Sequence, residues 1–185
     1  DKAYEFQIEG IRRVYGSETI YHRLDYILDV VGLTEYKQNM EKLVLVIVLN
    51  KDNAINKENF ERQTYKYKCL INLEDLTEEI FKSADMFTYF DEKAVYGDYY
   101  IEDMVNGFKY TDSSFITKDS YYRGKKLIQG KRHDYYTGIF DIYRTIFWRN
   151  CYSFTSVIKC TPESINDDKG DSIDSLNYCY NGIGV

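Results

Sequence analysis

The chain has 185 residues, of which 44% are hydrophobic, and a formal net charge of −6 at neutral pH. This length allows one domain, or two small ones, with a buried core. The acidic balance argues against a general affinity for nucleic acid, which requires a concentrated basic face. The longest apolar run, Leu43–Leu49, is far shorter than the roughly 20 residues needed to cross a bilayer. We therefore expect neither a nucleic-acid partner nor a membrane span.

The first 49 residues contain three predicted helices. The first covers Tyr4–Tyr15. The second covers Ile20–Val31, where apolar residues recur at helical spacing, and Gly32 follows at the place of a left-handed cap. The spacing within Glu35–Leu49 also favours a helix, although the β-branched residues of Leu43–Leu49 leave a buried strand as the alternative.

The middle of the chain is less regular. Helices are predicted over Glu58–Ile71, Asn72–Ala84 and Ile101–Phe108, the second with Asn72 as its capping residue. Asp85–Tyr100 and Tyr110–Arg132 show no clear period. We expect loops or short strands in these two stretches, including a small hairpin.

The most regular pattern of all covers Asp134–Arg149, where apolar residues from Ile139 to Phe147 follow a helical stripe. Further helices are predicted over Thr155–Lys159 and Asp171–Tyr180, and Pro162 is placed as the first residue of a helix. A single proline also argues against an all-β chain, which usually needs more turn residues.

These patterns together predict an all-α protein, mainly a helical bundle, with minor β structure possible. It would form one domain, 1–185, or two related helical units, 1–95 and 96–185. A weak internal repeat supports the second arrangement, because Ile55 precedes Cys69 by the same 14 residues that separate Ile165 from Cys179.

The four cysteines form an even set without the C-x-x-C spacing of zinc or redox sites: Cys69, Cys151, Cys160 and Cys179. Such a set favours two structural disulfides in a secreted protein, with three possible connectivities. The alternative is a reduced intracellular protein whose thiols are scattered through the core. We predict the first, a disulfide-stapled bundle.

The sequence shows no recognisable catalytic or cofactor motif. His22 and His133 are the only histidines, and neither lies in a metal-binding spacing. Paired acids are frequent, but they fall where solvated helix faces would place them. We therefore predict no enzyme activity, no metal site and no cofactor.

One local exception to the acidic balance is Arg123–His133, which carries five Lys or Arg residues among eleven and is flanked by tyrosines. A basic, tyrosine-rich segment can bind an acidic partner surface; the alternative is a flexible loop that acids elsewhere neutralise. The predicted partner-binding residues are Arg123, Lys125, Lys126, Lys131, Arg132, Tyr135 and Tyr136.

Cys151-Tyr152 through Cys160, and Tyr178-Cys179-Tyr180 further on, resemble the cysteine-tyrosine-cysteine pattern of the bicycle family of secreted aphid effectors. Tyr65–Cys69 resembles a degenerate first copy, with one cysteine where a full copy has two. The resemblance touches only these few positions. It implies salivary secretion, delivery into plant tissue and action on host proteins.

The function expected from the sequence is that of a secreted effector, an interaction protein that binds a host or partner macromolecule without catalysis. Tyrosine side chains suit this role, because they give a large contact area at a small cost in conformational entropy. The alternative is a helical carrier that encloses a small hydrophobic or aromatic ligand.

Overall fold

The computed structural model describes residues 2–37, 41–136, 141–161, 165 and 169–181. The chain divides into two compact units, Asp1–Glu41 and Lys42–Val185. Among the described residues, no helix combines the length and the apolar character that a bilayer span requires.

The first unit is helical, with α1 (Lys2–Ser17), α2 (Ile20–Val30) and the short 3-10 helix η1 (Thr34–Tyr36). The N-terminus of α2 is capped by Thr19, whose hydroxyl lies 2.7 Å from Nδ1 of His22. Gly32 follows α2 with a φ of 75°, the left-handed conformation that glycine adopts without strain. The helices predicted over 4–15 and 20–31 are thus confirmed.

The second unit contains a seven-stranded sheet in the order β2-β1-β3-β9-β5-β10-β8. β1, β2 and β3 are parallel, and β9 runs antiparallel to both of its neighbours. The strands are β1 (Val44–Val48), β2 (Lys68–Asn72), β3 (Met86–Tyr89), β5 (Phe115–Thr117), β8 (Asp134–Tyr136), β9 (Thr145–Trp148) and β10 (Gly170–Ser172).

A second sheet has four strands in the order β4-β11-β6-β7. They are β4 (Ala94–Tyr96), β6 (Tyr121–Arg123), β7 (Lys126–Ile128) and β11 (Tyr178–Tyr180). β6 and β7 form a tight hairpin in which Gly124 has a φ of 57°. This hairpin confirms the one expected within Tyr110–Arg132.

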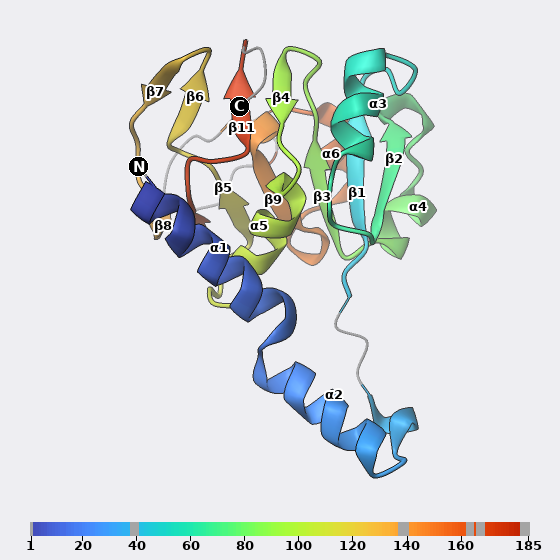
Figure 1. Ribbon diagram of the computed structural model, residues 1–185. Helices are drawn as coiled ribbons and strands as arrows, with labels where there is room; N and C mark the ends of the chain where they lie inside the picture. The colour runs from blue at the N-terminus through green and yellow to red at the C-terminus, as the bar shows by residue number, and fades with distance from the viewer. Residues whose placement is uncertain (1, 38–40, 137–140, 162–164, 166–168, 182–185) are drawn as a thin grey trace. The chain divides into compact units, whose positions relative to one another are not determined.

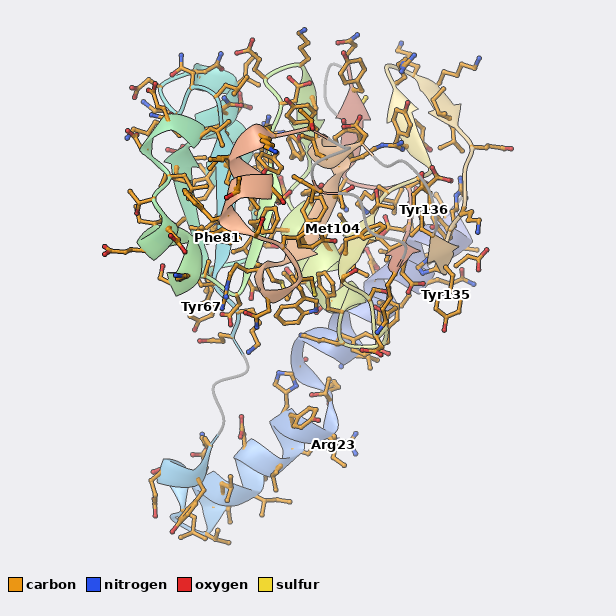
Figure 2. The ribbon with its side chains drawn as sticks, turned by 180° about the vertical axis from the view of Figure 1, so that it is seen from behind. Arg23, Tyr67, Phe81, Met104, Tyr135 and Tyr136 are labelled. Atoms are coloured by element: carbon orange, nitrogen blue, oxygen red, sulfur yellow. The ribbon has the colours of Figure 1, made fainter. Side chains whose placement is uncertain are left out.

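Helices cover both faces of the large sheet. They are α3 (Ala54–Glu61), α4 (Glu78–Ser83), α5 (Tyr100–Gly107) and α6 (Phe154–Lys159), with 3-10 turns η2 (Leu73–Asp75), η3 (Ile142–Arg144) and η4 (Arg149–Cys151). β1 alternates between two cores: Val46 packs with Met104 of α5, and Ile47 packs with Phe81 of α4. Figure 2 labels Met104 and Phe81 on their helices.

The prediction of an all-α helical bundle is wrong, because the protein is a mixed α/β structure with two sheets. Strands lie within the helix predicted over 134–149, where residues 137–140 lie outside the described part, and within those predicted over 35–49, 58–71 and 171–180. The reason is that central strands buried on both faces form continuous apolar runs. Such runs lack the alternation by which a strand is distinguished from a helix.

The predicted disulfides are also wrong, because all four cysteines are free. Cys69 lies on β2 at one end of the large sheet, whereas Cys179 lies on β11 in the other sheet. Cys151 is exposed in η4, and Cys160 ends α6 in a left-handed conformation. The sheets therefore distribute the thiols over separate elements. Pro162, the predicted helix start, lies outside the described residues.

Candidate functional site

Several loops meet at one edge of the seven-stranded sheet, which we call the carboxyl edge. β1 and β3 are parallel and end there. Since β9 is antiparallel to β3 and to β5, β9 begins at this edge and β5 ends at it, as does β10, which is parallel to β5. Figure 1 shows α3 and the second sheet at the same end. The segments next to these strand ends carry Asn50, Asp91, Lys118, Asp141 and Asp174.

The order of the strands reverses at β1. The chain passes from β1 to β2 on one side, and then returns to β3 on the other. The connecting helices lie on opposite faces, because Phe60 of α3 packs against one core and Phe81 of α4 belongs to the other. In open α/β sheets such a reversal leaves a crevice beyond the carboxyl ends of the strands, where ligands bind.

α3 holds β4 at this edge through polar side chains. Asn59 and Gln63 are both buried. The side-chain Nδ2 of Asn59 donates to the backbone carbonyl of Ala94 at 2.9 Å, and its Oδ1 accepts from the backbone amide of Tyr96 at 3.1 Å. Gln63 accepts from the amide of Ile101 at 3.0 Å. Their bonds to backbone atoms fix the positions of β4 and α5 relative to α3.

Two carboxylates face this edge from neighbouring loops. Asp91 follows β3, and its Oδ1 accepts from the amide of Lys93 at 3.0 Å. Asp141 precedes β9 and accepts from the amide of Tyr143 at 3.0 Å. The hydroxyl of Tyr96 joins the two loops, because it accepts from the amide of Asp91 at 2.9 Å and donates to the carbonyl of Tyr143 at 2.7 Å.

Two tyrosines feel the charges of both carboxylates. Burial raises the pKa of Tyr143 to about 12 and that of Tyr178 far above its usual value. The negative charges of Asp91 and Asp141 contribute to both pKa shifts, so both carboxylates lie near the same two hydroxyls. These tyrosines stay protonated at neutral pH and can donate hydrogen bonds.

The basic groups of this edge are engaged in the structure. The Arg144 guanidinium donates to the carbonyls of Lys118 and Asp119 at 2.7 and 3.0 Å, and it lies 4.4 Å from the ring centroid of Tyr121. The Lys118 ammonium pairs with Asp174 at 2.9 Å, and both side chains are buried. Within the described part of the chain, no group of three or more His, Cys, Asp or Glu residues could hold a metal ion.

No model of a known protein family matches the chain, and comparison with curated proteins finds no relative. The site must therefore be judged by its own geometry.

The predicted partner-binding residues fall into two groups on different sheets. The first group lies on the β6–β7 hairpin, where Lys125 and Lys126 are exposed. Arg123 of the same hairpin lies over the ring of Tyr180, 5.5 Å from its centroid. This group therefore presents two lysines at a turn, with an arginine packed beside them.

The second group lies on and just before β8, at the opposite end of the large sheet from Phe81 (Figure 2). Lys131 donates to the carbonyl of Tyr135 at 2.7 Å, and the side chain of Tyr135 is 76% exposed. Arg132 and Tyr136 are half-buried, and burial raises the pKa of Tyr136. Lys131 and Tyr135 are thus brought together.

An open groove of about 390 Å³ adjoins this second group. It lies along β8 and β10 and the loop before β5, and its lining includes Tyr110, Tyr135 and Asp171. Asp171 is buried and accepts a 2.6 Å hydrogen bond from Ser113. The groove shares Tyr135 with the predicted partner-binding residues.

The sequence analysis missed Asp91, Tyr96, Asp141 and Arg144. One available signal was the run Met86–Phe90, rich in aromatic and β-branched residues and followed directly by Asp91, which is typical of a strand with a polar residue at its end. Asp141 carried no such signal, because its position at the carboxyl edge depends on the antiparallel placement of β9.

Proposed function

We propose that this chain binds a nucleotide-type ligand at the carboxyl edge of β1 and β3. The observation that carries the proposal is the reversal of strand order at β1, with two carboxylates in the loops beside it. Doubly wound sheets of the order 2-1-3 bind nucleotide-type cofactors between their first and third strands. The present sheet begins with this order.

The chemistry of the edge favours a ligand with hydroxyl groups. Carboxylate oxygens accept hydrogen bonds from hydroxyls, and a carboxylate binds the ribose in the related doubly wound sheets of order 3-2-1-4-5-6. Asp91 and Asp141 would serve this purpose. The protonated hydroxyl of Tyr143, which is only partly buried, adds a donor for the oxygens of the ligand.

Calorimetry and thermal unfolding with nucleoside diphosphates and nucleosides test the proposal. A ligand at 100 times its Kd stabilises a protein by about 2.7 kcal/mol, which raises the Tm by roughly 5–10 °C for a chain of this size. We expect such a shift with at least one nucleotide. The Asp91→Asn and Asp141→Asn variants should lose it, since an amide NH₂ cannot accept a hydrogen bond from a hydroxyl.

Glu61→Gln is a matched control, because this exposed carboxylate lies at the far end of α3. It should bind the nucleotide as the unmodified chain does. The proposal is wrong if no nucleotide or nucleoside shifts the Tm, or if Asp91→Asn and Asp141→Asn both bind as tightly as Glu61→Gln.

A second candidate function is the binding of an acidic partner macromolecule, as the sequence analysis expects. What supports it is the exposure of Lys125 and Lys126 on the hairpin, in a stretch from Tyr121 to His133 without any acidic residue. The two functions are compatible, because the hairpin turn and the Asp91 loop belong to different segments.

A further inference from the structure

We infer that Tyr96 is a positioning residue whose hydroxyl couples the Asp91 loop to the Asp141 loop, so that the two carboxylates keep one relative position. Its role in ligand binding rests on the proposed function. The coupling itself is a property of the protein without ligand and can be tested separately.

The backbone of Tyr96 is fixed by α3. Its amide donates to Asn59 at 3.1 Å, and its carbonyl accepts from Gln63 at 3.2 Å. These two side chains are buried, Asn59 on α3 and Gln63 just after it, so Tyr96 enters the interior from a defined point of β4.

The ring of Tyr96 is fixed by other aromatic residues. It stacks on Phe90 with centroids 3.8 Å apart and an interplanar angle of 9°, and it meets Tyr100 and Tyr178 edge-on at 4.9 and 5.4 Å. The side chain is fully buried. Such packing leaves the ring a single orientation, which determines where the hydroxyl lies.

The hydroxyl of Tyr96 contacts both loops. It accepts from the amide of Asp91 at 2.9 Å and donates its proton to the carbonyl of Tyr143 at 2.7 Å. Tyr143 is also the residue whose amide donates to Asp141. The hydroxyl therefore connects the backbone of Asp91 to the backbone of Tyr143, which in turn binds the Asp141 carboxylate.

Removal of this one oxygen, in Tyr96→Phe, keeps the ring and its stacking but leaves the Asp91 amide and the Tyr143 carbonyl without these bonds. Tyr65→Phe is a matched control. The hydroxyl of Tyr65 also accepts from an amide and donates to a carbonyl, both of Lys42, at 3.1 and 2.8 Å. Lys42 precedes β1, at the other edge of the sheet.

Amide hydrogen exchange in the protein without ligand gives the first readout. Tyr96→Phe should accelerate exchange at the Asp91 amide by about tenfold, the effect of losing one neutral hydrogen bond. Tyr65→Phe should accelerate exchange at Lys42 and leave Asp91 unchanged. Unchanged exchange at Asp91 in Tyr96→Phe would overturn the inference.

A second readout uses Asp91→Asn, and its first arm needs only the otherwise unmodified chain. Asp91→Asn in the otherwise unmodified chain should shift the amide resonances of Tyr143 and Arg144, because the perturbation passes through the Tyr96 hydroxyl. In Tyr96→Phe the same substitution should shift them less, because only the direct effect of the lost charge remains. If Asp91→Asn moves neither resonance in the unmodified chain, the two loops are not coupled and the inference is refuted.

Nucleotide affinity is the third readout. We expect the Kd to rise about tenfold in Tyr96→Phe and less than twofold in Tyr65→Phe, in line with one hydrogen bond. If no nucleotide binds while the first two readouts appear, the proposed function fails and the coupling stands. If a nucleotide binds equally well to Tyr96→Phe, the hydroxyl has no role in ligand binding and that part of the inference fails.

Discussion

Removal of the buried ammonium of Lys118 should destabilise the protein strongly. Lys118 Nζ lies 2.9 Å from the Asp174 carboxylate, and the two side chains are 0% and 3% exposed. Lys118→Met keeps much of the apolar stem but leaves the Asp174 charge buried without its partner. The amide of Leu176 still donates to this carboxylate at 2.7 Å, which offsets only part of the loss.

The size of the effect follows from the burial. An ion pair broken inside a protein costs about 3–5 kcal/mol, because one charge stays buried and uncompensated. At roughly 2–4 °C per kcal/mol for a chain of this size, the Tm of Lys118→Met should fall by roughly 10 °C. Urea unfolding followed by circular dichroism measures the same loss as a free energy.

Lys82→Met serves as the control, because Lys82 pairs with Glu78 at 2.7 Å with both side chains more than half exposed. Its loss should cost less than about 1 kcal/mol, since water screens an exposed pair. The double variant Lys118→Met with Asp174→Asn should recover part of the stability by removing the buried charge. Equal losses in Lys118→Met and Lys82→Met would show that the buried pair has no special effect on stability.

Three further results are expected. Gly170→Ala should destabilise by about 1–3 kcal/mol in urea unfolding, because its Cβ would overlap the buried ring of Phe115; a neutral effect would contradict the packing. A thiol reagent at pH 8 should modify the exposed Cys69 and Cys151 quickly and Cys160 slowly. The reason is that burial raises the pKa of the Cys160 thiol, so that its reactive thiolate forms only at higher pH. Fewer than four reactive thiols in the unfolded protein would contradict the free cysteines. A variant that combines Lys125→Glu, Lys126→Glu, Lys131→Glu and Arg132→Glu should no longer bind an immobilised acidic peptide, and its Tm should not fall. Intact binding by this variant would show that these basic residues do not bind the partner.

The sequence predicted helices at α1, α2, α5 and α6 and missed most of the strands. α1, α2, α5 and α6 have polar and apolar faces or clear caps, so their period is visible. In β9 both faces are buried, because Ile146 belongs to one core and Phe147 to the other. A strand of this kind joined to a 3-10 turn imitates a helical stripe, which explains the wrong prediction over 134–149.

α3 shows the opposite failure. Its buried face carries Asn56, Asn59 and, just after the helix, Gln63, so polar residues occupy positions where the sequence analysis looked for apolar ones. The candidate site was hidden for a related reason. Asp91 and Asp141 are 50 residues apart, and their loops are neighbours only because β3 and β9 pair in antiparallel fashion. The basic hairpin, in contrast, is a local feature and was found as such.

The buried polar groups of the carboxyl edge suggest why the site and the fold depend on the same contacts. Apolar residues of similar size can often replace a buried ion pair without loss of stability. Asn59, however, binds particular backbone atoms of β4 and so selects one position for that strand, whereas an apolar side chain would accept several. The selected position is the one from which Tyr96 reaches both carboxylate loops. The Asn59→Leu variant should therefore keep the fold but displace Asp91 relative to Asp141.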